Sequence, residues 1–267
     1  MKHRQLLQLL RDNAAPRAEG TPPAVRSETT GDGQAHVYVY DVIDAWFGAS
    51  AAGLVQALAG FRGQDVTLHV NSPGGDVFEG RAMAAAIVAH DGQVIVQVDG
   101  LIASAATYLA RAANEVRITD GGRYMIHNSW TLGIGDKTDL RQIADLLDGV
   151  DADIANDYAR QTGASLEQVK AWMDAETWFS AADAVANKFA NSVTPNSRRD
   201  AAASASAANA ARWNLRAYAH APQFEPPPPA ADDTAAADAA AAAAAAAEAA
   251  LHRRQANSNR LRLTVCA

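Results

Sequence analysis

A serine and a histidine stand in this chain where they could form a nucleophile and its base. Ser104 lies in "GLIASAAT", between Ala103 and Ala105, and these small neighbours leave its hydroxyl accessible to a carbonyl group. His127 follows the apolar run "YMI" in "RYMIHNSW", and a serine needs such a base to become nucleophilic. Serine before a helix is more commonly an N-cap, and a histidine at a strand end is more often structural. Each residue taken alone therefore favours the ordinary role.

Two acidic residues further along the chain could orient that histidine. Asp174 and Glu176 stand in "WMDAETWFS", between a helical pattern and an aromatic pair. A carboxylate that holds an imidazole in place would be the third member of a catalytic triad. Acids ahead of a helix are also commonly solvated or act as caps. Both interpretations remain open for both residues.

The stretch "NSPGGDVFEG" carries a pair of glycines between a strand-like run and a helical pattern. A turn is the simplest explanation. The alternative is that the turn presents backbone N–H groups at a helix N-terminus, where negative charge is stabilised. Gly75 could donate one N–H, and Ala105, the residue after the serine, could donate another. Two such donors would make an oxyanion hole.

The elements that must position these residues alternate along the chain. Apolar runs such as "DVTLHV" and "QVIVQVDG" predict strands, and segments with helical spacing separate them. This alternation predicts an α/β domain with largely parallel pairing. Ser50 and Ser165 are expected to begin helices, and residues 137–161 are expected to form one long helix.

The chain divides into three parts by composition. Residues 1–33 are rich in Pro, Gly, Ser and charge, and we expect a flexible segment there. Residues 34–197 contain the predicted α/β domain. Residues 198–267 form a Pro- and Ala-rich extension, in which the alanine run is expected to be a helix without a large apolar face.

Charge and cysteine content exclude several classes of protein. The formal net charge is -7, so a basic nucleic-acid surface is not expected. No stretch has the length and apolarity of a membrane-spanning helix. The single cysteine, Cys266, allows no internal disulfide, and a cytoplasmic location is expected.

Four motifs in order resemble the ClpP serine peptidases over residues 36–195: "NSPGGDVFEG", "DGLIASAAT", "RYMIHNSW" and "ETWFSAADAVANKFANSV". The resemblance implies an α/β ClpP/crotonase fold, a spiral of β-β-α units with a protruding long helix, and self-association into rings. It implies Ser104 as nucleophile and His127 as general base, and it implies no metal or cofactor. Gly75 and Ala105 match the oxyanion donors. The third position matches Glu176, where the family usually has Asp, and Asp174 is the fallback.

The segment "HVYVYDVIDAWFGASAAGLVQAL" and the long extension look more like the ClpP-related head maturation proteases of tailed bacteriophages. That resemblance implies capsid and scaffold proteins as substrates, in the host cytoplasm or the prohead. One alternative is a proteolytic subunit served by an ATP-driven unfoldase. A second is a catalytically weak scaffold or assembly protein, suggested by the Glu-for-Asp change and the Ala-rich tail. An acyl-CoA enzyme of the crotonase superfamily is a weaker alternative, and neither nucleic acid nor membrane is an expected partner.

Overall fold

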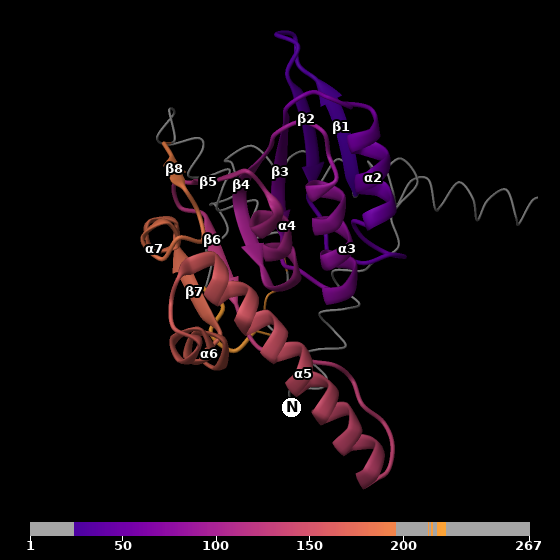
Figure 1. Ribbon diagram of the computed structural model, residues 1–267, viewed down its shortest axis with the longest axis vertical. Coiled ribbons are helices and arrows are strands. Elements are labelled where there is room, and N and C mark those ends of the chain that lie inside the picture. Colours follow the sequence, from indigo (N-terminus) through magenta and orange to yellow (C-terminus); the bar gives the residue numbers. More distant parts are fainter. Residues whose placement is uncertain (1–23, 196–212, 214, 216–217, 223–267) are drawn as a thin grey trace, which may run out of the picture. The chain divides into compact units, whose positions relative to one another are not determined.

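The computed structural model describes residues 24–195, 213, 215 and 218–222 (Figure 1). Contacts within the chain group residues 1–226 as one compact unit and residues 227–267 as a second. All described residues belong to the first unit. The predicted helix in the alanine run lies outside the described residues.

One mixed sheet forms the frame of the described unit. Its strands follow the order β1-β2-β3-β4-β5-β8, and β6 pairs with β4 and with β7. Pairing is parallel except for β1 with β2 and β6 with β7, so the expected largely parallel sheet is confirmed. The strands are β1 (Val25–Thr29), β2 (Ala35–Val39), β3 (Val66–Ser72), β4 (Val94–Ala103), β5 (Glu115–Thr119), β6 (Arg123–Ile126), β7 (Thr177–Ser180) and β8 (Ser192–Thr194).

Helices cover one face of this sheet, as Figure 1 shows for α2, α3 and α4. Alternate residues of β2, β3 and β4 are fully buried, as the two-residue period of a strand requires when one face meets a core. The helical elements are α2 (Ala51–Ala59), α3 (Val77–Val88), the 3₁₀ turn η1 (Ser104–Ala106), α4 (Thr107–Ala112), α5 (Lys137–Thr162), α6 (Leu166–Asp174) and α7 (Ala181–Ala186).

Helix α5 runs away from the sheet for much of its length (Figure 1). Its buried residues all lie in its second half, from Ile154 to Thr162, whereas Leu140 and Leu146 are exposed. A capping box at Asp136 begins the helix. The long helix predicted from residue 137 is therefore confirmed. Among the described residues, no helix combines the length and the apolarity needed to cross a membrane.

Local signals predicted the starts of two other helices correctly. Ser50 caps α2 by accepting from the Gly53 N–H, and Ser165 caps α6 by accepting from the Gln168 N–H. Each hydroxyl satisfies one of the N–H groups that a helix leaves unpaired at its start.

Three strands of the structure were not predicted from the sequence. β1 lies within the segment expected to be flexible, so that expectation was wrong for Val25–Thr29. Four of its five residues are exposed. An edge strand of this kind lacks the alternation of apolar and polar residues from which a strand is predicted. β7 and β8, of four and three residues, were also missed.

Candidate active site

Ser104 lies at the end of β4, where the backbone turns sharply into η1. Its φ is 52°, in the left-handed region that a non-glycine residue occupies at a cost of about 1–2 kcal/mol. Such strain tends to occur at functional sites. The N-cap of η1 is Ala103, with no side-chain cap bond, so Ser104 is not the cap that its sequence context favoured.

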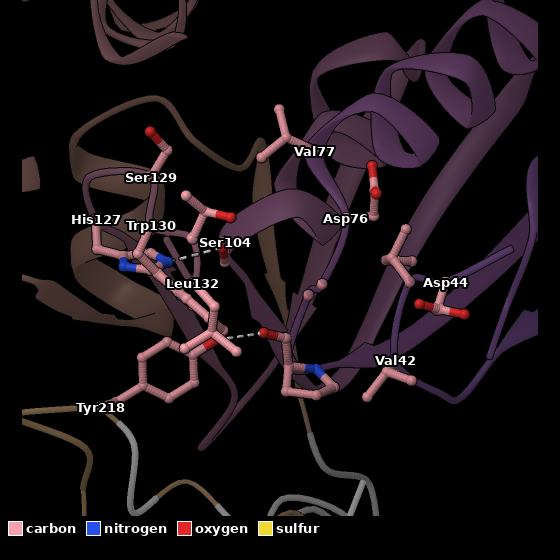
Figure 2. Close-up of a pocket in the computed structure, with 15 residues that line it drawn as sticks. Val42, Asp44, Asp76, Val77, Ser104, His127, Ser129, Trp130, Leu132 and Tyr218 are labelled. Atoms are coloured by element: carbon pink, nitrogen blue, oxygen red, sulfur yellow. Dashed lines mark hydrogen bonds between the residues drawn. The ribbon is translucent and has the colours of Figure 1, made fainter. Parts of the chain in front are cut away.

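Pairing of two parallel strands brings the histidine to this serine. β6 runs beside the end of β4 with Ala103 opposite Met125, so the two chains leave the sheet at the same edge. His127 follows directly after β6, and its Nε2 lies 2.7 Å from Ser104 Oγ (Figure 2). Sequence reasoning named both residues, and the structure brings them within hydrogen-bond distance.

Buried hydrogen bonds hold the turn that carries Ser104. The Thr107 hydroxyl donates to the Ser104 carbonyl at 2.6 Å, and its oxygen is also 2.6 Å from the Tyr158 hydroxyl on α5. Ala105 and Ala106 are almost fully buried. These buried contacts therefore hold the turn on its inner side, while the side chain of Ser104 faces the pocket.

The environment of His127 favours its neutral form. Burial lowers the pKa of the imidazole below its usual 6.5, and the negative charges of Glu176 and Asp151 only partly offset that shift. A neutral imidazole bonded to a serine hydroxyl can accept the hydroxyl proton. The arrangement is therefore suited to general-base catalysis near neutral pH.

The two acids expected near His127 bind other partners. The Glu176 carboxylate accepts from Trp178 Nε1 at 3.1 Å and from two backbone N–H groups, those of Ala219 and His220, at 2.8 Å each. Asp174 accepts from Asn128 Nδ2 at 2.8 Å. Within the described residues, neither acid is hydrogen-bonded to His127.

A third acid near the histidine was missed by sequence reasoning. Asp151 lies on α5 and accepts from the Ser129 N–H at 2.6 Å. Its charge acts on His127, although less than the charge of Glu176. Nothing in the helical pattern of α5 distinguishes Asp151 from the other acids of that helix, so only the folded chain identifies it.

The two glycines of the predicted turn take backbone conformations closed to other residues. Gly74 has φ 90° and Gly75 has φ 147°. A Cβ on Gly75 would lie 2.1 Å from the Ile43 carbonyl oxygen, and one on Gly74 would lie 2.5 Å from the Ala103 carbonyl oxygen. Gly74 therefore allows the turn to pack directly against the residues that flank Ser104.

Gly75 forms an isolated parallel bridge with Ile43, and this pairing leaves the N–H of Gly75 directed away from the segment that contains Ile43. Ile43 N–H donates to the Gly74 carbonyl and Asp76 N–H donates to the Ile43 carbonyl, both at 2.8 Å. In a parallel pairing of this kind the N–H of the intervening residue points to the other side. The N–H of Ala105 belongs to the first turn of η1, where no intrahelical acceptor exists. Both groups are suited to receive an oxyanion.

The serine, the histidine and the glycine pair share one pocket of ≈ 310 Å³ (Figure 2). Ser104, His127, Gly74 and Gly75 contribute to its lining. Most of the remaining wall is apolar and includes Val42, Pro73, Val77, Trp130, Leu132 and Tyr218. A serine–histidine pair beside backbone donors in an apolar pocket can carry out acyl transfer through a tetrahedral intermediate.

Sequence reasoning also missed that part of the extension packs at this site. Trp213 and Leu215 are buried against an apolar cluster that includes Val42 and Met125, and Tyr218 lines the pocket. A signal was present, because these large apolar residues stand in "RWNLRAYAH" within a sequence otherwise rich in alanine and polar residues. The predicted domain end at residue 197 stays a prediction.

Comparisons with known proteins agree with this geometry. The sequence model of the family described as Clp protease matches residues 34–197. ATP-dependent Clp protease proteolytic subunit 1 of Leifsonia xyli subsp. xyli is 28% identical over 137 residues, which cover 51% of this chain and 70% of that protein. ATP-dependent Clp protease proteolytic subunit 2 of Thermobifida fusca is 31% identical over 142 residues, covering 51% of this chain and 68% of that protein.

Among solved structures, a ClpP1 point mutant from Listeria monocytogenes has a TM-score of 0.54 and 24% identity. The likeness covers 61% of this chain and 92% of that chain. It bears on the fold alone, and the α/β ClpP-type fold expected from the sequence is confirmed.

Proposed function

Because the chain belongs to the Clp protease family, we propose that it is a serine peptidase in which Ser104 is the nucleophile and His127 the general base. The observation that carries this proposal is the 2.7 Å contact between Ser104 Oγ and His127 Nε2 within the pocket. The family supports peptide-bond hydrolysis, and the serine type rests on this contact.

The proposed reaction begins when Ser104 Oγ attacks the carbonyl carbon of a peptide bond. The hydroxyl proton passes to His127 Nε2, and the N–H groups of Gly75 and Ala105 stabilise the oxyanion. The imidazolium then gives its proton to the leaving amine as the C–N bond breaks. Water hydrolyses the acyl-enzyme by the same route, returning the proton to Ser104.

Glu176 is proposed as the third member of the triad, with Asp174 as the fallback. Of the two carboxylates whose charge raises the pKa of His127, Glu176 has the larger effect and Asp151 the smaller. A charge that raises the pKa of the imidazole also stabilises the imidazolium formed during attack. This electrostatic role supports Glu176 over Asp174, whose carboxylate accepts from Asn128.

Labelling with a fluorophosphonate, followed by intact-mass measurement, tests the nucleophile. We expect one adduct on the wild type and none on Ser104→Ala. Ser165→Ala is the matched control, because Ser165 only caps α6 and its loss should leave the adduct intact. Failure of both the folded wild type and folded Tyr218→Ala, a variant that removes a side chain lining the pocket, to form any adduct would refute the serine mechanism.

We propose a role in phage head maturation, with capsid and scaffold proteins as substrates in the host cytoplasm or the prohead. The support is the segment that includes Trp46 and Phe47, together with the long extension beyond residue 197. The matched relatives are proteolytic subunits of ATP-dependent Clp proteases, and they favour a second candidate, a subunit that works with an ATP-driven unfoldase. Cleavage of purified scaffold protein without ATP would favour the first role, whereas degradation only with an unfoldase and ATP would favour the second.

Self-association into rings is also proposed. The exposed first half of α5, with Leu140 47% and Leu146 61% exposed, supports it because an isolated subunit leaves this apolar surface in water. A monomer in size-exclusion chromatography with light scattering would contradict this part of the proposal.

A further inference from the structure

Part of the C-terminal extension lies against the candidate active site, and we call it the strap: Trp213, Leu215 and residues 218–222. Trp213 is 8% and Leu215 7% exposed. Both pack on the apolar cluster that includes Leu101 and Ala103, at the end of the strand that leads to Ser104. Burial of two large side chains anchors the strap to the domain.

Tyr218 of the strap enters the pocket itself. Its hydroxyl donates to the Pro73 carbonyl oxygen at 2.7 Å, and its ring meets the His127 ring edge-on at 5.4 Å (Figure 2). A second edge-on contact, at 5.6 Å, joins it to Trp178. Burial raises the pKa of Tyr218, as does the charge of Glu176, so the phenol stays protonated and donates. The side chain therefore takes up apolar space beside Ser104 that a substrate side chain would need.

The next two residues of the strap bind the proposed acid. The N–H groups of Ala219 and His220 donate to Oε2 and Oε1 of Glu176, so each carboxylate oxygen has a backbone partner. Hydrogen bonds to a charged acceptor are among the stronger ones in proteins. Glu176 is thus held by the strap and by Trp178 instead of by His127.

From these contacts we propose that the strap is an intramolecular ligand that keeps the active site latent. Tyr218 occupies the substrate pocket, and the following backbone withholds Glu176 from His127. Displacement of the strap opens the pocket and frees the carboxylate to orient the imidazole. This proposal rests on the proposed function, because it requires Ser104 to be a working nucleophile.

Two variants of the full-length chain separate the contributions of Tyr218. Tyr218→Ala removes both the ring and the hydroxyl, whereas Tyr218→Phe keeps the ring in the pocket and removes only the hydroxyl, with its bond to Pro73 and its interaction with Ser104. Loss of a single hydrogen bond should raise the fraction of molecules with a displaced strap by about five-fold. Loss of a buried aromatic ring should raise this fraction by more. We therefore expect fluorophosphonate labelling about five-fold faster in Tyr218→Phe and at least about ten-fold faster in Tyr218→Ala.

Amide hydrogen exchange provides a readout that does not depend on activity. The amides of Ala219 and His220 should exchange slowly in the wild type and fast in Tyr218→Ala. Unchanged exchange elsewhere in the domain shows that the variant is folded.

The outcomes distinguish this proposal from the proposed function. Equal or slower labelling of folded Tyr218→Ala would overturn latency alone, because Ser104 would still react. Unprotected amides at Ala219 and His220 in the wild type would also overturn it. No adduct on any variant would refute the serine peptidase function and the latency that rests on it. Faster labelling together with lost protection supports the proposal.

Discussion

Gly74 is the residue whose enlargement should most directly displace the nucleophile. A Cβ at this position would lie 2.5 Å from the Ala103 carbonyl oxygen, 2.8 Å from Ser104 Cβ and 3.0 Å from the Ala105 nitrogen. All three neighbours belong to the turn that sets the position of Ser104. The substitution Gly74→Ala therefore forces either the turn or Ser104 to move.

Two effects add up in the stability of Gly74→Ala. The backbone has φ 90°, and placing a Cβ in a left-handed conformation costs about 1–2 kcal/mol. Forcing an extra methyl into a packed site costs typically ~1–3 kcal/mol more. We expect the free energy of unfolding to fall by roughly 2–5 kcal/mol in total.

Gly121→Ala is the matched control. Gly121 has φ 83°, close to that of Gly74, but a Cβ there would meet nothing within 4 Å. It should show only the backbone cost of about 1–2 kcal/mol, with an unchanged rate of labelling at Ser104. Urea unfolding of both variants then separates the clash from the strain.

The rate of fluorophosphonate labelling tests the functional half of the prediction. A displacement of about 1 Å at a reacting group can lower a rate by about 10²-fold, so Gly74→Ala should react about that much more slowly. The rate is measured under conditions where the variant remains folded, as judged by circular dichroism. Labelling of Gly74→Ala at the rate of Gly121→Ala would refute the inference that Gly74 sets the position of Ser104.

Two further predictions concern the histidine and the core. Because burial lowers the pKa of His127, the labelling rate should fall on acidification with a midpoint below pH 6.5, as the imidazole becomes protonated. Glu176→Gln removes a charge that raises this pKa, so a pH–rate profile of that variant should fall at still lower pH; a shift to higher pH would contradict the assigned sign. Phe189 is fully buried and stacks on Tyr124 at 4.8 Å, so Phe189→Ala should lower the free energy of unfolding by about 3–5 kcal/mol in urea titrations. Phe78→Ala, at a site 63% exposed, is the control and should change it by less than about 0.5 kcal/mol.

Local chemistry made much of the fold predictable. The helix starting at Lys137, the caps at Ser50 and Ser165 and the alternating strands follow from interactions between residues close in the chain. Such signals depend on periodicity and on the unpaired N–H groups of a helix start, so the sequence alone displays them. β1 escaped detection because its main partner is the backbone of β2 and its side chains are mostly exposed.

Four sequence motifs were enough to identify the residues of the candidate site. They did not predict which of these residues contact one another. Ser104 and His127 meet only because β4 and β6 pair with Ala103 opposite Met125, a register set by the whole sheet. Sequence context favoured a capping role for Ser104, and the left-handed turn at the end of β4 decided against it. A turn of this kind is held by tertiary contacts, which no local propensity records.

By itself, the sequence of this protein determined the chemistry available: a serine, a histidine, two acids and a glycine pair, in an order typical of one peptidase family. Tertiary structure decided how these groups are connected. It gave Glu176 the backbone N–H groups of residues 219 and 220 as partners, 43 and 44 positions further along the chain. It also brought Tyr218 to the carbonyl of Pro73, a residue 145 positions earlier. Contacts over such separations depend on packing of the complete chain, because local propensities act over only a few residues.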